Sequence, residues 1–286
     1  MAIDISIRAG LTADTSSVSA SGSVQHVITD TEVNSFGLQD GNLKNAVGRY
    51  FGQNPNDAFL HSDTPWDDLY RTYGWPQVQT VLVVDSATVI GITSEPTIIA
   101  QQTFSNDSNV KGTFNVGISQ QVANTSSSSW SETNTITVGQ KFTYKVEFLG
   151  TGGGGETSLS YAHSWGETTG ESTTITVGTQ SGVSVPLDPG QAVQAQLTAS
   201  RGTMRVRVVY KAYVTGSTAI NYNPTFKDHH FWGLDIGSVM GAGGISNLLT
   251  FTEDIEIGFF TNSKIVLNDP SGQQLKTAFT AEAVHA

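Results

Sequence analysis

Side chains alternate between apolar and polar over an unusually long stretch of this 286-residue chain, residues 113–148. The apolar side chains occupy even positions, namely Phe114, Val116, Ile118, Val122, Trp130, Ile136, Val138, Phe142, Tyr144, Val146 and Phe148. Odd positions carry polar residues and glycine, with Ala123 as the one apolar exception. A period of two over such a span predicts extended strands with one apolar face and one polar face.

The composition supports a β-rich chain and excludes several function classes. Charged residues make up 14% of the sequence, below the usual figure of about 25%, and Ser, Thr, Asn, Gln and Gly fill the difference. Helical bundles and coiled coils need more Ala, Glu, Lys and Leu than this. The net charge of −11 argues against general binding of nucleic-acid phosphates. The absence of cysteine excludes disulfides, cysteine-based zinc sites and cysteine nucleophiles.

The sequence predicts neither a signal peptide nor a transmembrane helix. The first residues, MAIDISIRAG, lack a basic region and a long apolar run, so no classical signal peptide is expected. No run approaches the roughly 18 apolar residues of a transmembrane helix. A membrane-spanning β-hairpin leaves a much weaker trace in a sequence and stays open as an interpretation.

The segment from about residue 140 to 165 predicts a β-hairpin with two chemically different faces. Alternation stops at a glycine-rich turn between Leu149 and Glu156 and resumes after it with the opposite parity. The apolar side consists of Phe142, Tyr144, Val146, Phe148, Leu159, Tyr161 and Trp165, with Leu149 near the turn. The polar side consists of Lys141, Thr143, Lys145, Glu147, Glu156, Ser158 and Ser160. His163 is a mismatch on the apolar side.

Both strands of this hairpin are long enough to cross a bilayer. A membrane-spanning β-strand needs about 9–11 residues, and the stretches 140–148 and 156–165 supply nine and ten. A single hairpin would leave unpaired amides in lipid, so the hypothesis requires several copies that close a barrel. The apolar side would then face lipid and the polar side the pore lumen. An ordinary strand pair of a Ser/Thr-rich sandwich fits the pattern equally well.

Four aromatic residues lie within ten positions, namely Trp66, Tyr70, Tyr73 and Trp75. Two interpretations are open for this cluster. It forms a small core under a helix, or it forms an exposed platform that stacks on a sugar or another receptor group.

Known catalytic and metal-binding motifs are absent from the sequence. The spacing of Gly150, Gly152 and Gly155 matches a dinucleotide-binding fingerprint, but no helix is predicted to follow it. His229 and His230 are adjacent, so a strand would point them to opposite faces and away from a shared metal ion. We expect no metal, no cofactor and no enzymatic activity, with a β-rich hydrolase as the remaining alternative.

The chain divides by composition into three regions, 1–95, 96–216 and 217–286. The first predicts short helices over 40–51 and 63–70. Further strands are predicted over 78–84, 87–92, 192–199 and 204–214.

Several motifs in the centre of the chain occur in a characteristic order: 106–108 (Asn-Asp-Ser), 141–148, 156–160 followed by Trp165, 172–177, and 185–190 (Val-Pro-Leu-Asp-Pro-Gly). In this order they resemble the pore-forming region of the aerolysin family, which includes clostridial epsilon toxin and mosquitocidal toxins. The resemblance covers about residues 98–214. It implies a mainly β, elongated fold of long antiparallel strands with a small α+β lobe on the receptor side.

The resemblance also implies a function. A soluble monomer would bind a cell surface, oligomerise, and insert the hairpin of residues 140–165 as part of a transmembrane β-barrel that permeabilises or lyses the target cell. Residues 1–95 would form the receptor-binding lobe, 96–216 the pore-forming module, and 217–286 a C-terminal β segment packed on both.

The partners implied are target-membrane lipid, a cell-surface receptor for which a glycan is one candidate, and other copies of the chain, with no nucleic acid. The protein would be secreted or released in soluble form before it reaches the target membrane. The alternative is a carbohydrate-binding or storage protein that keeps this fold without forming pores.

Overall fold

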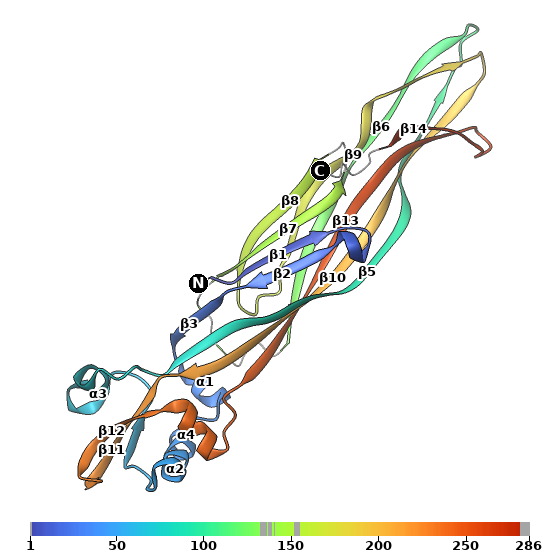
Figure 1. Ribbon diagram of the computed structural model, residues 1–286. Helices are drawn as coiled ribbons and strands as arrows, with labels where there is room; N and C mark the ends of the chain where they lie inside the picture. Colours follow the sequence, from blue (N-terminus) through green and yellow to red (C-terminus); the bar gives the residue numbers. More distant parts are fainter. Residues whose placement is uncertain (1, 132–135, 137–138, 140, 152–154, 281–286) are drawn as a thin grey trace.

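The computed structural model describes residues 2–131, 136, 139, 141–151 and 155–280. The molecule is long and narrow, with a shaft of extended strands and a small lobe at one end (Figure 1). The strands that run along the shaft are β5 (Gln79–Ser105), β6 (Gly112–Trp130), β9 (Gly170–Leu187), β10 (Ala192–Thr215) and β13 (Leu249–Asn268). Their sequences are rich in Val, Ile and Thr, whose branched side chains suit a pleated surface.

The long strands form a seven-stranded sheet, which we call the body. Its order is β3-β5-β10-β13-β6-β9, with β14 (Gln274–Thr280) also paired to β13 and β3 (Ser23–Val27) at one edge. Every pairing in the body is antiparallel. A sheet of this kind places alternate side chains on opposite faces.

A second sheet lies beside the body and has the order β2-β1-β7-β8. It contains β1 (Asp4–Ala9), β2 (Ser17–Ser21), β7 (Lys141–Thr151) and β8 (Gly155–Ser164). The pairing of β1 with β7 is parallel, and the other two pairings are antiparallel. The short 3-10 helix Ala13–Thr15 connects β1 to β2.

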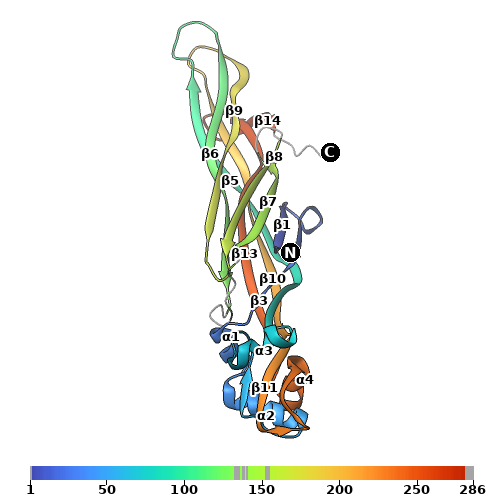
Figure 2. The same ribbon diagram turned by 90° about the vertical axis from the view of Figure 1, so that its left-hand side faces the viewer.

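The lobe combines a three-stranded sheet with four short helices. The sheet has the order β12-β11-β4, formed by β4 (Asp57–Phe59), β11 (Ser217–Phe226) and β12 (His229–Asp235). The helices are α1 (Asp30–Ser35), α2 (Asp40–Phe51), α3 (Pro65–Tyr73) and α4 (Ile236–Gly243). They gather at the lower end of the molecule in both views (Figure 1, Figure 2).

The main core lies between the body and the second sheet and continues into the lobe. On β10 the buried positions alternate over Met204, Val206, Val208, Tyr210 and Ala212. The side chains of β7 that share this core are Phe142, Tyr144, Val146 and Phe148. A smaller core, which includes Val116, Val177 and Leu197, fills the shaft farther from the lobe. The hairpin therefore supplies one wall of the main core.

The predicted mainly β fold of long antiparallel strands with a small α+β lobe is confirmed, and so is the helix over residues 40–51. Separate strands over 78–84 and 87–92 are wrong, because β5 continues without a break from Gln79 to Ser105. The strands over 192–199 and 204–214 are likewise one strand, β10, with a register shift between Thr198 and Ser200. Pairing with β10 carries β5 through Gly91 and Pro96, with three register shifts along the way.

The lobe is assembled from two distant parts of the chain, about 28–78 and 217–248. The predicted boundary at residue 95 therefore does not coincide with a structural boundary, since it falls inside β5. The strands β1, β2 and β3 lie within residues 1–95 but belong to the sheets of the shaft and not to the lobe. The junction between β10 and β11 lies near residue 216. Gly216 has φ +100 at the junction of β10 and β11, and a Cβ there would collide with the backbone of Gln77.

Asn106, which opens the motif over 106–108, fixes the far end of the shaft. Its buried amide donates hydrogen bonds to the Leu187 carbonyl at 2.8 Å and the Val110 carbonyl at 2.9 Å. Its side-chain oxygen accepts a hydrogen bond from the Ser108 hydroxyl at 2.7 Å. The side chain thus joins the end of β5 to the end of β9.

We expect Asn106→Ala to lower the free energy of unfolding by about 2–3 kcal/mol, because buried carbonyls lose their donors. Asn109→Ala, at an exposed position in the same loop, should change it by less than about 0.5 kcal/mol. Urea unfolding followed by circular dichroism measures both. Equal, small effects of the two substitutions would contradict this role for Asn106.

Candidate functional site

The hairpin formed by β7 and β8 separates apolar from polar side chains as expected from its alternation. Its register runs from Lys141 opposite Ser164 to Thr151 opposite Gly155. Buried side chains on it are Phe142, Tyr144, Val146, Phe148, His163 and Trp165, while Leu149, Leu159 and Tyr161 are half-buried. Exposed side chains are Lys141, Thr143, Lys145, Ser158 and Ser160, and Glu147 is half-buried. Gln140, at the predicted start, and the side chain of Glu156 lie outside the described residues.

The apolar face of the hairpin packs against the body through an aromatic cluster, Trp130, Phe142, Trp165, Tyr210 and Phe251. Phe142 lies 5.8 Å from Trp165 and 5.7 Å from Tyr210 between ring centroids. Trp130 stacks on Tyr210 at 5.6 Å, and Trp165 meets Phe251 edge-on at 5.2 Å. Such aromatic pairs add about 0.5–1.5 kcal/mol each beyond the burial of their area. The cluster therefore holds the open end of the hairpin to β10 and β13.

A buried carboxylate, Glu253 of β13, stands at the centre of this interface. The Tyr144 hydroxyl donates to its two oxygens at 2.8 and 3.0 Å, and the Tyr210 hydroxyl donates at 2.7 Å. The His163 Nε2 atom lies 3.8 Å from Glu253 Oε1, and the His163 ring stacks on Tyr144 at 4.3 Å. Glu253 is 0% exposed. The hairpin and the body thus share one polar centre inside an apolar interface.

The environment of Glu253 changes its acidity. Burial raises the pKa of its carboxyl to about 7, and the hydrogen bonds from Tyr210 and Tyr144 offset part of that rise. Burial also raises the pKa of the Tyr210 hydroxyl, as does the charge of Glu253. Sequence reasoning did not find Glu253. The available signal was an acidic residue at an apolar position of β13, in the series Phe251, Glu253, Ile255 and Ile257.

One edge of the hairpin is held by a single short strand. All six residues of β1, Asp4–Ala9, pair with residues 143–148 of β7. On the other side β8 is the last strand in the order of its sheet. Both views show β7 and β8 alongside the shaft, next to β13 rather than inside the body sheet (Figure 1, Figure 2). Among the described strands, β1 is therefore the one that holds the hairpin at an edge.

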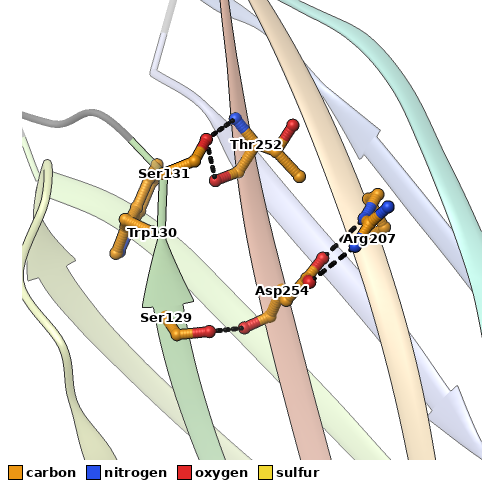
Figure 3. Close-up of a pocket in the computed structure, with 6 residues that line it drawn as sticks. All are labelled: Ser129, Trp130, Ser131, Arg207, Thr252 and Asp254. Atoms are coloured by element: carbon orange, nitrogen blue, oxygen red, sulfur yellow. Dashed lines mark hydrogen bonds and ion pairs between the residues drawn. The ribbon is translucent and has the colours of Figure 1, made fainter.

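The chain before the hairpin is fastened to the body at the end of β6. The Thr252 amide donates to the Ser131 hydroxyl oxygen at 3.0 Å, and the Ser129 hydroxyl donates to the Asp254 carbonyl at 3.4 Å (Figure 3). The Arg207 guanidinium binds the Asp254 carboxylate at 2.7 and 2.8 Å, which holds the pKa of Asp254 below its usual value. These side chains, with Trp130, line a shallow pocket of about 340 Å³. The charged groups of this pocket, Arg207 and Asp254, are paired with each other. The contacts around the pocket therefore fasten the end of β6 to the body just before the hairpin begins.

An aromatic platform on the lobe comprises Phe59, Trp66, Tyr73, Trp75 and Phe231. Trp66 is 45% exposed and lies 5.1 Å from Phe231 between ring centroids. Tyr73 is 50% exposed and stacks on Trp75 at 4.6 Å. Of the four predicted receptor residues, Trp66, Tyr73 and Trp75 therefore gather on this surface.

Tyr70, the fourth predicted receptor residue, is a core residue. It is 3% exposed, and its hydroxyl donates to the Phe59 carbonyl at 2.7 Å and accepts from the Ala219 amide at 3.2 Å. Its side chain joins α3 to β4 and β11, so we leave it out of the aromatic platform.

The backbone that presents Trp66 is strained. Trp66, Asp67 and Asp68 have φ values of 61, 56 and 61, in the left-handed region that non-glycine residues rarely occupy. The buried Asp68 carboxylate accepts hydrogen bonds from the Ser62 hydroxyl at 2.9 and 3.1 Å and holds this turn. Strain of this kind concentrates at binding surfaces.

His229 and His230 are both exposed, at the start of β12. Across the described part of the chain, no group of three or more His, Cys, Asp or Glu side chains is placed to hold a metal ion. No helix among the described residues is long and apolar enough to cross a membrane.

The two faces of the hairpin differ in their expected contribution to stability. We expect Phe142→Ala to lower the free energy of unfolding by about 3–5 kcal/mol, because it empties the centre of the aromatic cluster. Thr143→Ala, next to it on the exposed face, should change it by less than about 0.5 kcal/mol. Urea unfolding measures both. A Phe142→Ala effect as small as that of Thr143→Ala would contradict the packing described.

Comparisons with known proteins agree with this architecture. The family model of Clostridium epsilon toxin ETX/Bacillus mosquitocidal toxin MTX2 matches residues 59–268. U-megalopygitoxin(8)-Mo12 of Megalopyge opercularis is 35% identical over 248 residues, which are 87% of this chain and 85% of that protein. U-megalopygitoxin(8)-Mc8 of Megalopyge crispata is 35% identical over 243 residues, 85% of this chain and 83% of that protein.

Among solved structures, the parasporin-2 toxin of Bacillus thuringiensis, described as recognising cancer cells, aligns with a TM-score of 0.66. The alignment has 18% sequence identity and covers 86% of this chain and 98% of parasporin-2, which supports a shared fold. The resemblance to aerolysin-like toxins is thereby confirmed. The chain belongs to the Clostridium epsilon toxin ETX/Bacillus mosquitocidal toxin MTX2 family of toxins.

Proposed function

We propose that this protein is a pore-forming toxin whose monomer binds a cell surface, oligomerises, and inserts the hairpin of β7 and β8 into the bilayer. The observation that carries the proposal is the storage of this hairpin. Its apolar face is buried against the body, its polar face is exposed, and among the described strands β1 is the one that pairs it to the rest of its sheet. Such a ribbon can change its apolar partner from protein to lipid without losing burial.

The dimensions of the hairpin suit a bilayer. The strand β7 has 11 residues and β8 has 10, and a spanning strand needs about 9–11. Released from the body, the buried side chains of β7 and β8 would face lipid. The exposed Thr143, Lys145, Ser158 and Ser160 would line the pore lumen.

Insertion requires other copies of the chain. A hairpin in lipid leaves amides and carbonyls unpaired at both edges, at a cost of several kcal/mol per group. Adjacent hairpins from neighbouring copies remove these edges by closing a barrel. In the monomer β1 already shields one edge of β7, so release means exchanging β1 for a strand of another copy.

The aromatic platform is the surface that we assign to receptor binding. Exposed aromatic faces stack on the C–H faces of sugar rings, and Trp66 and Tyr73 present such faces on α3 of the lobe. A cell-surface glycan is therefore the receptor chemistry that the platform fits. The protein would be released by the producing cell in soluble form and would act on the membrane of another cell. We propose no enzymatic activity for it.

A disulfide between β1 and β7 tests insertion. Asp4 and Thr143 are exposed register partners on these strands, and the chain has no cysteine of its own. We expect the oxidised Asp4→Cys, Thr143→Cys protein to bind cells normally but to release no dye from red cells or liposomes. Reduction should restore release.

The matched control is a disulfide within the hairpin, Thr143→Cys with Ala162→Cys, which are register partners on β7 and β8. This disulfide does not tie the hairpin to β1 or to the body, so the oxidised control protein should still permeabilise membranes. Undiminished dye release by the oxidised Asp4→Cys, Thr143→Cys protein would refute insertion of β7 and β8. Cell binding without dye release by the unmodified chain would support the alternative of a carbohydrate-binding protein that forms no pore.

Substitutions on the aromatic platform test receptor binding. We expect Trp66→Ala and Tyr73→Ala each to weaken cell binding by about tenfold or more, as loss of one stacking aromatic costs about 1–3 kcal/mol at such sites. Tyr50→Ala is the control, because Tyr50 is 45% exposed on α2 of the same lobe and outside the platform. Flow cytometry with labelled protein measures binding. If Trp66→Ala and Tyr73→Ala bind cells as well as Tyr50→Ala does, the aromatic platform is not the receptor-binding surface.

A further inference from the structure

The Glu253 cluster, which consists of Glu253, Tyr210, Tyr144 and His163, joins the two strands of the hairpin to two strands of the body, and these contacts must break if the hairpin leaves the body. Glu253 belongs to β13 and Tyr210 to β10, whereas Tyr144 and His163 belong to the hairpin. The Tyr144 hydroxyl donates to Glu253 at 2.8 Å from the hairpin side, and the Tyr210 hydroxyl donates at 2.7 Å from the body side. Removal of the hairpin would leave Glu253 with Tyr210 and water.

The tautomer of His163 leaves one position in the cluster for a proton. The Nδ1 atom lies 3.0 Å from the Ser164 carbonyl, which only accepts hydrogen bonds, so Nδ1 carries the ring proton. The Nε2 atom is then a bare acceptor, buried and without a hydrogen-bond partner, 3.8 Å from Glu253 Oε1. A proton on Glu253 would lie between a carboxyl oxygen and this nitrogen.

Among the described residues, no cation faces Glu253 to balance a negative charge. The groups that face it are Tyr210 from β10, Tyr144 from β7, and His163 and Tyr161 from β8, with Trp130 opposite on β6. On its own strand Asp254 adds negative charge, and Arg207 is bound to Asp254. Beyond His163 stand two more carboxylates, Glu167 and Glu171. An ionised, buried Glu253 is therefore costly.

We propose that the Glu253 cluster is a proton-dependent lock on the hairpin: a proton on Glu253 holds the hairpin against the body, and loss of that proton to water loosens it. The lock rests on the proposed function in one respect, since the hairpin it controls is the one that inserts.

The direction of the pH dependence follows from the carboxyl group of Glu253. Its pKa is raised to about 7 in the stored state and returns toward the ordinary value of about 4.3 when water reaches it. Between these values the stored state holds a proton that the released state lacks, so storage is stabilised below about pH 7 and loses this contribution as the pH rises through 7. A hydrated His163 takes up a proton below about pH 6.5, which acts in the opposite direction in acid.

Glu253→Gln tests the lock, because its amide stays neutral, accepts from the tyrosines and can donate to His163 Nε2. The measurement is hydrogen exchange of β7 and β8 amides in solution, for both proteins at the same pH. We expect the ratio of opening constants, the original chain over Glu253→Gln, to rise about tenfold between about pH 6 and about pH 8.5. Intrinsic exchange rates and the titration of His163 are common to both proteins and cancel. A ratio that stays constant overturns the lock.

Tyr144→Phe provides an independent test that keeps the carboxyl group. A tyrosine hydroxyl stabilises a carboxylate more than a neutral acid, so its loss should increase opening more at about pH 8.5 than at about pH 6. Tyr161→Phe is the control, because its hydroxyl pairs with that of Ser126 at 2.7 Å, and its effect should be equal at both pH values. Equal effects of Tyr144→Phe at both pH values overturn the lock.

These measurements use no membrane. A constant exchange ratio therefore overturns the lock and leaves the proposed function standing. Failure of the disulfide between β1 and β7 to block permeabilisation overturns the proposed function and leaves the exchange ratio unaffected.

Discussion

Burial of the hairpin's apolar face against the body is the interaction on which the rest of the structure depends. Four side chains of β7, Phe142, Tyr144, Val146 and Phe148, are 0% exposed and complete the main core. Without them the buried side chains of β10 and β13 would face water. The same four side chains would make an isolated hairpin stick to any apolar surface, so storage protects both the body and the hairpin.

This arrangement explains how one chain could serve two environments. The hydrophobic effect has no direction and depends on the apolar area removed from water, so lipid can replace the body as the partner of the hairpin. Backbone hydrogen bonds are less interchangeable, because in the proposed pore a strand from another copy would have to replace β1 at the edge of β7. The polar pair Tyr144 and Glu253 is the part of the interface that lipid cannot replace. It is therefore the natural place for control over release.

Local periodicity predicted the strands and the two faces of the hairpin, whereas contacts between distant residues determine the strand lengths and the roles of Tyr70 and Glu253. Alternation separated the buried Phe142, Tyr144, Val146 and Phe148 of the hairpin from the exposed Lys141, Thr143 and Lys145. The helix expected over residues 40–51 is α2. The strands expected over 78–84 and 87–92 are one strand, β5, which continues through Pro96 because β10 pairs on one side and no described strand is hydrogen-bonded to the other side there. Tyr70 and Tyr73 look alike in sequence, but only packing against Ala219 buries Tyr70. Glu253 acquires its role from Tyr144 and Tyr210, 109 and 43 residues away, a distance over which periodicity carries no information.

The structure of the membrane-bound oligomer, determined by cryo-electron microscopy on liposomes, tests the central claim most directly. The account predicts a ring of copies around a closed β-barrel to which each copy contributes two strands, β7 and β8, with Val146 and Leu159 toward lipid and Lys145 and Ser160 toward the lumen. A membrane-bound protein in which β7 still lies between β1 and β8, packed on Tyr210 and Phe259 of the body, would contradict it.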